Sequence, residues 1–206
     1  MKTPSQLSPA PMDLALTMSG SAVSRFFPIL GEGLLVKGLG GENVEGFLQK
    51  AAGVSPAYLK DRVQTVFLDG RALDDCSTTV VGDGAVLALS AAMPGLAGAV
   101  LRRGGFYAAM RRPISHEGGG AAAAGAEITV TLKLFNLVAR DLGPGLLGRG
   151  ILLPGSRLKD FIARQGRWIW KGCKGATVDG RRVGVEEVPG LIRPGREVVL
   201  TVASEQ

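Results

Sequence analysis

The 206-residue chain is long enough to bury the cores of one large or two small domains, and its 46% hydrophobic and 20% charged residues are typical of a globular protein. Aromatic residues make up only 5%, whereas 31 Gly and 11 Pro indicate many turns and favour short strands over long helices. The two cysteines, Cys76 and Cys173, do not suggest a disulfide framework, and with the single histidine, His116, the sequence has no zinc-ligand spacing and no evident Cys-His or Ser-His pair. These counts favour a cytoplasmic protein that is no enzyme and uses no metal or cofactor.

The formal net charge of +6 is unevenly distributed along the chain. Residues 1–95 contain 7 basic and 9 acidic residues, residues 96–125 contain 4 and 1, and residues 126–206 contain 13 and 8. A basic region can bind nucleic acid or acidic partners, although it is more often a solvated surface.

The first half of the chain predicts strands, one main helix and a hairpin after a disordered lead-in at residues 1–11. Met12–Met18 alternates apolar and polar residues as a half-buried strand does, and the apolar residues of Glu42–Ala52 recur at helical spacing before Gly53. Asp69-Gly70 supplies the positive φ angles of a tight hairpin turn. The other expected elements are a turn-rich connection at Ser19–Pro28, a strand at Leu34–Val36, a short helical turn within Ser55–Val63 and a strand at Val86–Leu89.

The second half repeats this order of elements. Ile128–Leu134 predicts a first strand, Asp179-Gly180 a hairpin turn and Val198–Val202 a closing strand. Between them we expect a connection at Leu142–Gly145, a strand at Ile151–Leu153 and a helix from Ser156 to Gly166. We therefore predict an internal duplication, with a first module at 12–99, a basic and then Gly/Ala-rich linker at 100–126, and a second module at 127–206.

Residues 84–101 form an uncharged stretch that only just reaches the length of a membrane-spanning helix. Pro94, Gly95 and Gly98 interrupt it, and the hairpin context explains Val86–Leu89 better as a strand. The sequence therefore favours a protein without a membrane span.

Two strands, a helix, a hairpin and a closing strand form the β-grasp arrangement, in which a mixed sheet wraps one helix. The expected fold class is accordingly α+β, with two tandem β-grasp (ubiquitin-like) modules. The second module resembles the small sulfur-carrier proteins of molybdopterin and thiamin biosynthesis, and residues 12–99 do so more loosely. The segments that carry this resemblance are Ile128–Phe135, Ile151–Phe161, Val178–Arg181 and Pro194–Val199.

In the sulfur-carrier family a C-terminal Gly-Gly tail enters an adenylating enzyme, which activates the terminal carboxylate. The resemblance implies candidate tails at Gly95 and Gly98 or at Gly104 and Gly105, but the chain continues beyond both pairs. Sulfur-carrier or ubiquitin-like modifier chemistry would therefore require cleavage after Gly98 or Gly105.

The absence of a free tail and of a catalytic constellation makes a non-catalytic protein-interaction module our leading expectation. Sheet faces or a basic arm would bind the protein partner, and the arm residues are Arg102, Arg103, Arg111 and Arg112. An alternative is RNA binding by the second module, because aromatic rings can stack on bases while neighbouring cations hold phosphates. The candidate residues are Arg167, Trp168, Trp170, Lys171, Lys174, Arg181 and Arg182.

Overall fold

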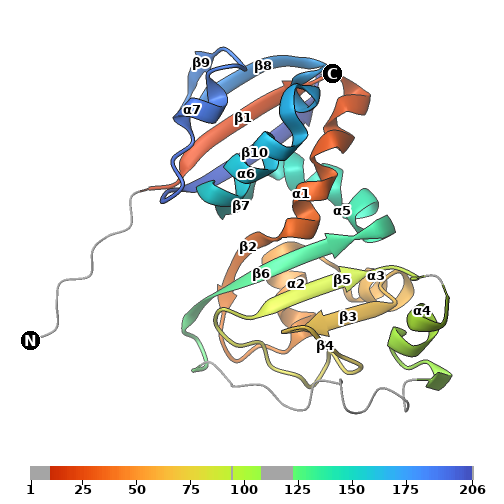
Figure 1. Cartoon of the computed structure of the whole chain (residues 1–206). Helices are drawn as coiled ribbons and strands as arrows, with labels where there is room; N and C mark the ends of the chain where they lie inside the picture. Colours follow the sequence, from red (N-terminus) through yellow and green to blue (C-terminus); the bar gives the residue numbers. More distant parts are fainter. Residues whose placement is uncertain (1–9, 94, 108–122, 206) are drawn as a thin grey trace, which may run out of the picture. The chain divides into compact units, whose positions relative to one another are not determined.

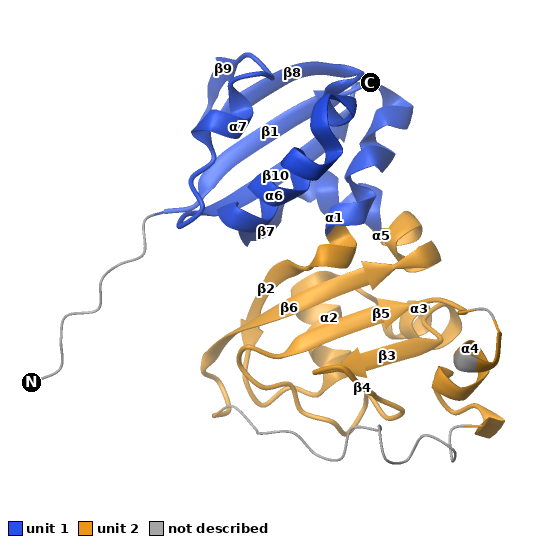
Figure 2. Cartoon of the chain, viewed as in Figure 1, with its two compact units in different colours: residues 1–29, 143–206 blue, residues 30–142 orange. Residues whose placement is uncertain are grey.

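The computed structural model describes residues 10–93, 95–107 and 123–205, and these form an α+β protein (Figure 1). Contacts divide the chain into two compact units (Figure 2): unit 1 consists of residues 1–29 and 143–206, and unit 2 of residues 30–142. In sequence, unit 2 is thus an insertion into unit 1. The chain leaves unit 1 within helix α1 (Phe27–Glu32) and returns to it within helix α5 (Asn136–Arg149).

Unit 2 contains a five-stranded mixed sheet with the order β4-β3-β5-β6-β2. The β2–β6 pair is antiparallel, β6–β5 is parallel, and β5–β3 and β3–β4 are antiparallel. The strands are β2 (Leu34–Leu39), β3 (Thr65–Leu68), β4 (Arg71–Ala72), β5 (Val86–Ser90) and β6 (Glu127–Phe135), and the helices are α2 (Val44–Ala52), α3 (Pro56–Asp61) and α4 (Gly95–Leu101).

Helix α2 packs against one face of this sheet, behind the strands in Figure 1. Asn43 caps its start by accepting a hydrogen bond from the Gly46 amide, and Gly53 ends it in a left-handed conformation, as predicted. Phe47 of α2 lies so close to Gly38 of β2 that a Cβ at residue 38 would be 2.5 Å from the ring. Even-numbered residues of β2 therefore face the helix, and odd-numbered ones point away from it.

Unit 1 contains a second five-stranded sheet, with the order β7-β10-β1-β8-β9. Its pairs follow the same pattern as in unit 2: β7–β10 is antiparallel, β10–β1 is parallel, and β1–β8 and β8–β9 are antiparallel. The strands are β1 (Met12–Met18), β7 (Ile151–Pro154), β8 (Cys173–Val178), β9 (Arg181–Val183) and β10 (Glu197–Ser204), and the helical segments within this unit are η1 (Gly20–Phe26), α6 (Gly155–Gln165), η3 (Gly166–Trp170) and α7 (Val188–Leu191).

Helix α6 covers one face of this sheet with the apolar residues predicted from its spacing (Figure 1). Leu158 and Phe161 are fully buried and Ile162 is 4% exposed. The Phe161 ring packs against Phe26 of η1, with 6.2 Å between the ring centroids. Segments far apart in sequence therefore share the core of unit 1.

Both predicted hairpin turns are confirmed by their backbone angles. Asp69 and Gly70 have φ values of 51° and 79°, and Asp179 and Gly180 have φ values of 47° and 77°. Successive positive φ angles match the twist of two antiparallel strands, which is why Asp-Gly occurs at both turns.

The unit boundaries differ from the modules expected at 12–99 and 127–206. Strand β1, expected in the first module, pairs with β10 and β8 of unit 1. Strand β6, expected in the second module, pairs with β2 and β5 of unit 2. Alternation of apolar residues defines which face of a strand is buried, but it does not specify the partner strand.

Two expected connections are helical instead. Ser19–Pro28 contains η1 and the start of α1, and residues 142–145 lie inside α5 despite Pro144. Buried side chains occur in both halves of α5, where Val138 and Leu147 are fully buried, so packing outweighs the low helix propensity of its Gly and Pro residues.

The uncharged residues 84–101 contain strand β5 and helix α4. Within the described part of the chain, no helix combines the length and the apolarity needed to cross a membrane. Most of the expected lead-in at 1–11 and the middle of the expected linker at 100–126 lie outside the described residues.

Candidate functional site

The sheet of unit 2 presents a second face, opposite to α2, which we call the outer face. Its side chains alternate with the buried ones along each strand, and they are half-buried except for Lys37, which is exposed. The outer face consists of Leu35 and Lys37 on β2, Phe67 on β3, Val86 and Ala88 on β5, and Thr129, Thr131 and Lys133 on β6.

Cross-strand register places these residues in three neighbouring rows. Leu35, Thr131 and Val86 form the middle row. Lys37 and Thr129 form the row on one side, and Lys133, Ala88 and Phe67 form the row on the other. Apolar side chains therefore lie between two lysines. The next row on this side of the sheet, beyond Lys37, pairs Leu39 with Glu127, which are both exposed, so a carboxylate lies beside the three rows.

Further along β5 this face is covered. Ser90 and Thr65 are directly paired and buried, and the Asn136 side chain donates a hydrogen bond of 3.0 Å to the Ser90 hydroxyl. The same row continues to Phe135 of β6, which is 40% exposed, so at this end the face is covered over β5 and β3 but not over β6.

The candidate tail glycines follow β5 in a folded segment. Gly95 has a φ of 76° and begins α4. Gly98 is buried against the Met93 carbonyl group, so closely that any side chain at residue 98 would collide with the backbone. These two glycines satisfy backbone requirements of a turn and a close contact.

Arg103 fixes the next glycine pair to unit 2. Its Nη2 donates to the Leu59 carbonyl at 2.7 Å and its Nη1 to the Cys76 sulfur at 3.3 Å, while its backbone amide donates to the Gln64 carbonyl at 2.7 Å. The Gly104 amide donates to Asp74 Oδ1 at 3.0 Å. Residues 103 and 104 would have to leave these contacts before an extended tail could form.

A shallow cleft of about 380 Å³ lies beside Arg103 and is also lined by Asp75, Cys76 and Ser77. Hydrogen bonds from Ser77 and Thr78 lower the pKa of Asp75 to about 2, so this carboxylate is ionised and occupied within its own loop. Burial raises the pKa of the Cys76 thiol. A protonated thiol is a weak nucleophile, so Cys76 is not activated for covalent catalysis.

Helices α3 and α5 are joined by a polar cluster that the sequence did not reveal. The Tyr58 hydroxyl donates to Asp141 Oδ2 at 3.0 Å, and Arg62 Nη2 donates to the same oxygen at 3.0 Å. Burial and the Asp141 hydrogen bond raise the pKa of Tyr58 to about 12, and the Arg62 hydrogen bond lowers the pKa of Asp141. All three groups are paired with one another, which indicates a structural role.

The candidate RNA-binding residues all lie in unit 1 but do not share one face. Trp168 is 54% exposed, and its ring carries the guanidinium of Arg25 from η1 at 4.7 Å from the ring centroid. Arg181 and Arg182 are consecutive on β9 and therefore point to opposite faces of the sheet. The exposed residues near Trp168 are Arg167, Lys171 and Lys174, whereas Trp170 is half-buried.

Arg25 was not a candidate from the sequence, since 143 residues separate it from Trp168. Its Nη1 atom is buried and has no hydrogen-bond partner among the described residues. Contact with the indole ring is a cation–π interaction, which is favourable for a guanidinium at this distance.

The arm residues have different surroundings. Arg102 is exposed and Arg103 is anchored as described, whereas Arg111 and Arg112 lie outside the described residues. Phe106 and Tyr107 form an edge-to-face pair after the anchored glycines, with 5.2 Å between ring centroids, and Phe106 is 93% exposed.

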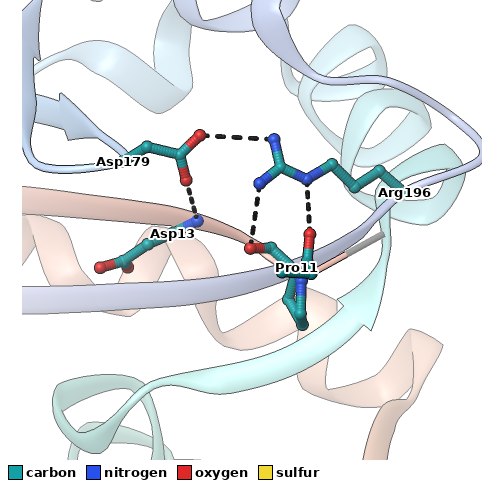
Figure 3. A network of polar contacts seen from close by, with 5 residues as sticks. Pro11, Asp13, Asp179 and Arg196 are labelled. Carbon is teal, nitrogen blue, oxygen red and sulfur yellow. Dashed lines mark hydrogen bonds and ion pairs between the residues drawn. The ribbon is translucent and has the colours of Figure 1, made fainter. Parts of the chain in front are cut away.

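A second polar network closes unit 1 where the N-terminal segment joins the sheet (Figure 3). Arg196 donates from Nε to the Ala10 carbonyl at 2.7 Å and from Nη2 to the Pro11 carbonyl at 3.1 Å, and its Nη1 lies 3.3 Å from Asp179 Oδ2. Asp179 Oδ1 in turn accepts from the Asp13 amide at 2.9 Å. The hairpin carboxylate and Arg196 thereby fix the start of β1.

The two units differ in net charge. Unit 1 contains 13 basic and 7 acidic residues, and unit 2 contains 11 of each, so the whole net charge of +6 belongs to unit 1. A unit with a net charge of +6 and a unit with no net charge suit different partners.

Comparison of the chain with protein-family models, curated proteins and solved structures finds no match.

Proposed function

We propose that this chain is a protein-interaction module whose outer face on unit 2 binds a partner protein, and that each unit is a β-grasp-like sheet around one main helix. The shared pairing pattern of the two sheets supports the β-grasp assignment, because each has a central parallel pair flanked by antiparallel strands. The single observation that supports binding is the partial exposure of apolar side chains on the outer face.

The outer face has the composition of a binding surface. Leu35, Val86, Ala88 and Phe67 lie in adjoining rows and remain half-buried, although their sequence neighbours on the same strands are buried beneath α2. Burying a contiguous apolar patch against another protein is favourable by roughly 25 cal/mol per Å² of apolar surface, before the costs of association.

The charges of the outer face support one class of partner. Lys37 and Lys133 lie in the rows on either side of the middle row, and the nearest carboxylate in register, Glu127, lies one row beyond Lys37. A partner surface with an apolar centre and carboxylates around it would complement this pattern. We therefore expect a protein partner that is acidic at the contact.

The test compares substitutions on the two faces of the same sheet. Val86→Asp and Lys133→Glu alter the outer face, whereas Arg71→Glu alters an exposed cation on β4 whose cross-strand partner, Leu68, faces α2. Tagged full-length proteins would be used to capture partners, with the mass of bait and prey measured. We expect one prey protein that wild type and Arg71→Glu retain and that Val86→Asp and Lys133→Glu lose.

Circular dichroism of each variant controls for folding. Prey that binds all four proteins equally would contradict the proposal, as would an absence of any prey that depends on residues 86 and 133. The measured bait mass also reports whether the chain has been cleaved after Gly98 or Gly105, as the sulfur-carrier alternative requires.

A further inference from the structure

We propose that the surface around Trp168 on unit 1 binds a single-stranded polynucleotide. We call it the Trp168 surface, and it comprises Arg25, Arg167, Trp168, Lys171 and Lys174. It belongs to a different unit from the outer face and is independent of the protein-binding proposal.

The geometry of the Trp168 surface holds the indole in an exposed position. Ile169 is fully buried and anchors the short helix η3 in the core, so the preceding residue, Trp168, extends to solvent. Just after η3 in the chain, the Gly172 carbonyl accepts a hydrogen bond of 2.8 Å from the Ser19 amide, which connects this segment to the start of η1. Arg25 from η1 then contacts the ring at 4.7 Å from its centroid.

Holding the ring in place favours stacking. The Trp168 side chain is 54% exposed, and the contact with Arg25 restricts its rotation in advance of binding. Base–aromatic stacking tolerates any sequence because each base has a π-face. Arg25 is a positioning residue in this proposal, since its guanidinium lies over the indole ring and its Nη1 atom is buried.

The charges around the ring suit a phosphate backbone. Between Asp160 and Asp179 the chain contains no acidic residue and four cations, Arg164, Arg167, Lys171 and Lys174. The last three are exposed and flank Trp168 in sequence, on η3, on the turn after it and on β8. Exposed cations before and after an exposed aromatic residue in the sequence match a strand in which phosphates alternate with exposed bases.

Single strands fit better than duplexes for a geometric reason. The bases of a duplex are stacked on each other, so their faces are closed to an indole, whereas an unpaired base can lie on it. No described feature reads the 2′-hydroxyl, so the chemistry recognised is common to RNA and single-stranded DNA.

The experiment measures fluorescence anisotropy of labelled 12-nucleotide oligo(U) and oligo(dT), with a 12-base-pair duplex for comparison, against the full chain over a range of salt concentrations. We expect both single strands to bind more tightly than the duplex, with a log–log salt slope of about −0.7 for each phosphate contact. Binding of only one single strand would assign the site to that nucleic acid.

Substitutions assign binding to the Trp168 surface. Trp168→Ala should weaken oligo(U) binding by about ten-fold or more, and Trp168→Phe should restore most of it, because stacking is worth about 1–3 kcal/mol per base. Lys171→Glu should weaken binding and reduce the salt slope, whereas Arg182→Glu, with the same change in net charge on β9, should have little effect. The Phe and Glu variants keep the test valid if Trp168→Ala does not fold.

Three results would overturn the proposal. The first is no binding of either oligonucleotide at low salt. The second is equal binding of the duplex, of polyglutamate or of anionic lipid vesicles, which would show a nonspecific polyanion surface. The third is equal weakening by Lys171→Glu and Arg182→Glu with no effect of Trp168→Ala.

Discussion

Units 1 and 2 share a pattern of strand pairing but obtain their strands differently. In unit 2, the strands β2 to β5 are joined by β6 from further along the chain, which inserts between β5 and β2. In unit 1, β10 lies beside β7, and the N-terminal strand β1 occupies the place between β10 and β8. The same pairing pattern is therefore completed by the last strand in sequence, β6, in unit 2, and includes the first strand in sequence, β1, in unit 1.

The surfaces of the two units differ more than their folds. The outer face of unit 2 contains Leu35, Val86 and Phe67. On the corresponding side of unit 1, Ala15, Thr177 and Thr201 form a row of small or polar residues, and the next row contains Asp13, Val199 and Leu152. Unit 1 instead carries the whole net charge and the exposed Trp168. The comparison indicates one architecture with two separate binding chemistries.

The largest expected effect concerns the boundaries of unit 2. A fragment comprising residues 30–142 contains all five strands of its sheet and should unfold cooperatively, whereas residues 12–99 lack β6 and should not fold. Val130, Leu132 and Leu134 of β6 are at most 1% exposed, so removing them opens the core between β5 and β2. Far-UV circular dichroism during thermal unfolding measures this, and a cooperative transition for 12–99 would contradict the assignment of β6 to unit 2.

A second prediction uses the position of the tryptophans, both of which lie in unit 1. Leu16→Ala in β1 should destabilise unit 1 by about 2–5 kcal/mol because Leu16 is 2% exposed in the middle of the sheet. Urea unfolding, monitored by tryptophan fluorescence, should show this decrease in the free energy of unfolding of unit 1. Leu132→Ala in unit 2 is the matched control, and an equal shift of the tryptophan signal by both variants would show that the units unfold together.

A third prediction concerns pH and unit 2 alone. Tyr58 has a pKa of about 12, above its value in the unfolded chain, so its contribution to stability is complete below pH 10 and is lost as the pH rises through 12. Asp141 has a lowered pKa, so its contribution is present above the unfolded value near 4 and is lost as the pH falls. The cluster should thus stabilise unit 2 most between about pH 4 and 10.

Spectrophotometric titration tests this cluster. On a Tyr107→Phe background, Asp141→Asn should lower the pKa of Tyr58, because a hydrogen-bonded carboxylate disfavours ionisation of the phenol. An unchanged Tyr58 titration would show that burial alone raises the pKa. Arg71→Glu, which leaves the cluster intact, is the control for a general effect of charge.

The smallest expected effect is at the start of β1. Arg196→Ala removes the hydrogen bonds to the Ala10 and Pro11 carbonyl groups and should destabilise the first residues of unit 1 by about 1 kcal/mol. Hydrogen exchange should accelerate at the Asp13 amide and not in unit 2. Uniform acceleration across both units would mean that the network in Figure 3 contributes to global stability.

Local structure was largely predictable from the sequence, because its determinants are local. Asp69-Gly70 and Asp179-Gly180 define their turns, Gly53 ends α2, and the spacing of Leu158, Phe161 and Ile162 defines the buried side of α6. Each of these signals lies within a few residues of the structure that it predicts.

Strand partners and binding surfaces could not be predicted in the same way. Ile128–Leu134 has the alternation of a strand, yet nothing within it distinguishes β2 and β5 from the strands of unit 1 as neighbours. Trp168 was a candidate, but its partner Arg25 comes from a distant segment. One local signal could have indicated the outer face. Consecutive apolar residues place apolar side chains on both faces of a strand, and such runs occur at Leu34-Leu35-Val36 and Val86–Leu89.

The chain passes from unit 1 to unit 2 within α1 and returns within α5, and this order has a consequence for the gene. Unit 2 is encoded by one uninterrupted segment, so a single excision that joins codon 29 to codon 143 would remove it and leave every strand of unit 1 in place. No single excision of a contiguous stretch can remove unit 1 and spare unit 2. Deletion of one internal segment can therefore yield a shorter chain that keeps the basic unit, but not one that keeps the neutral unit alone.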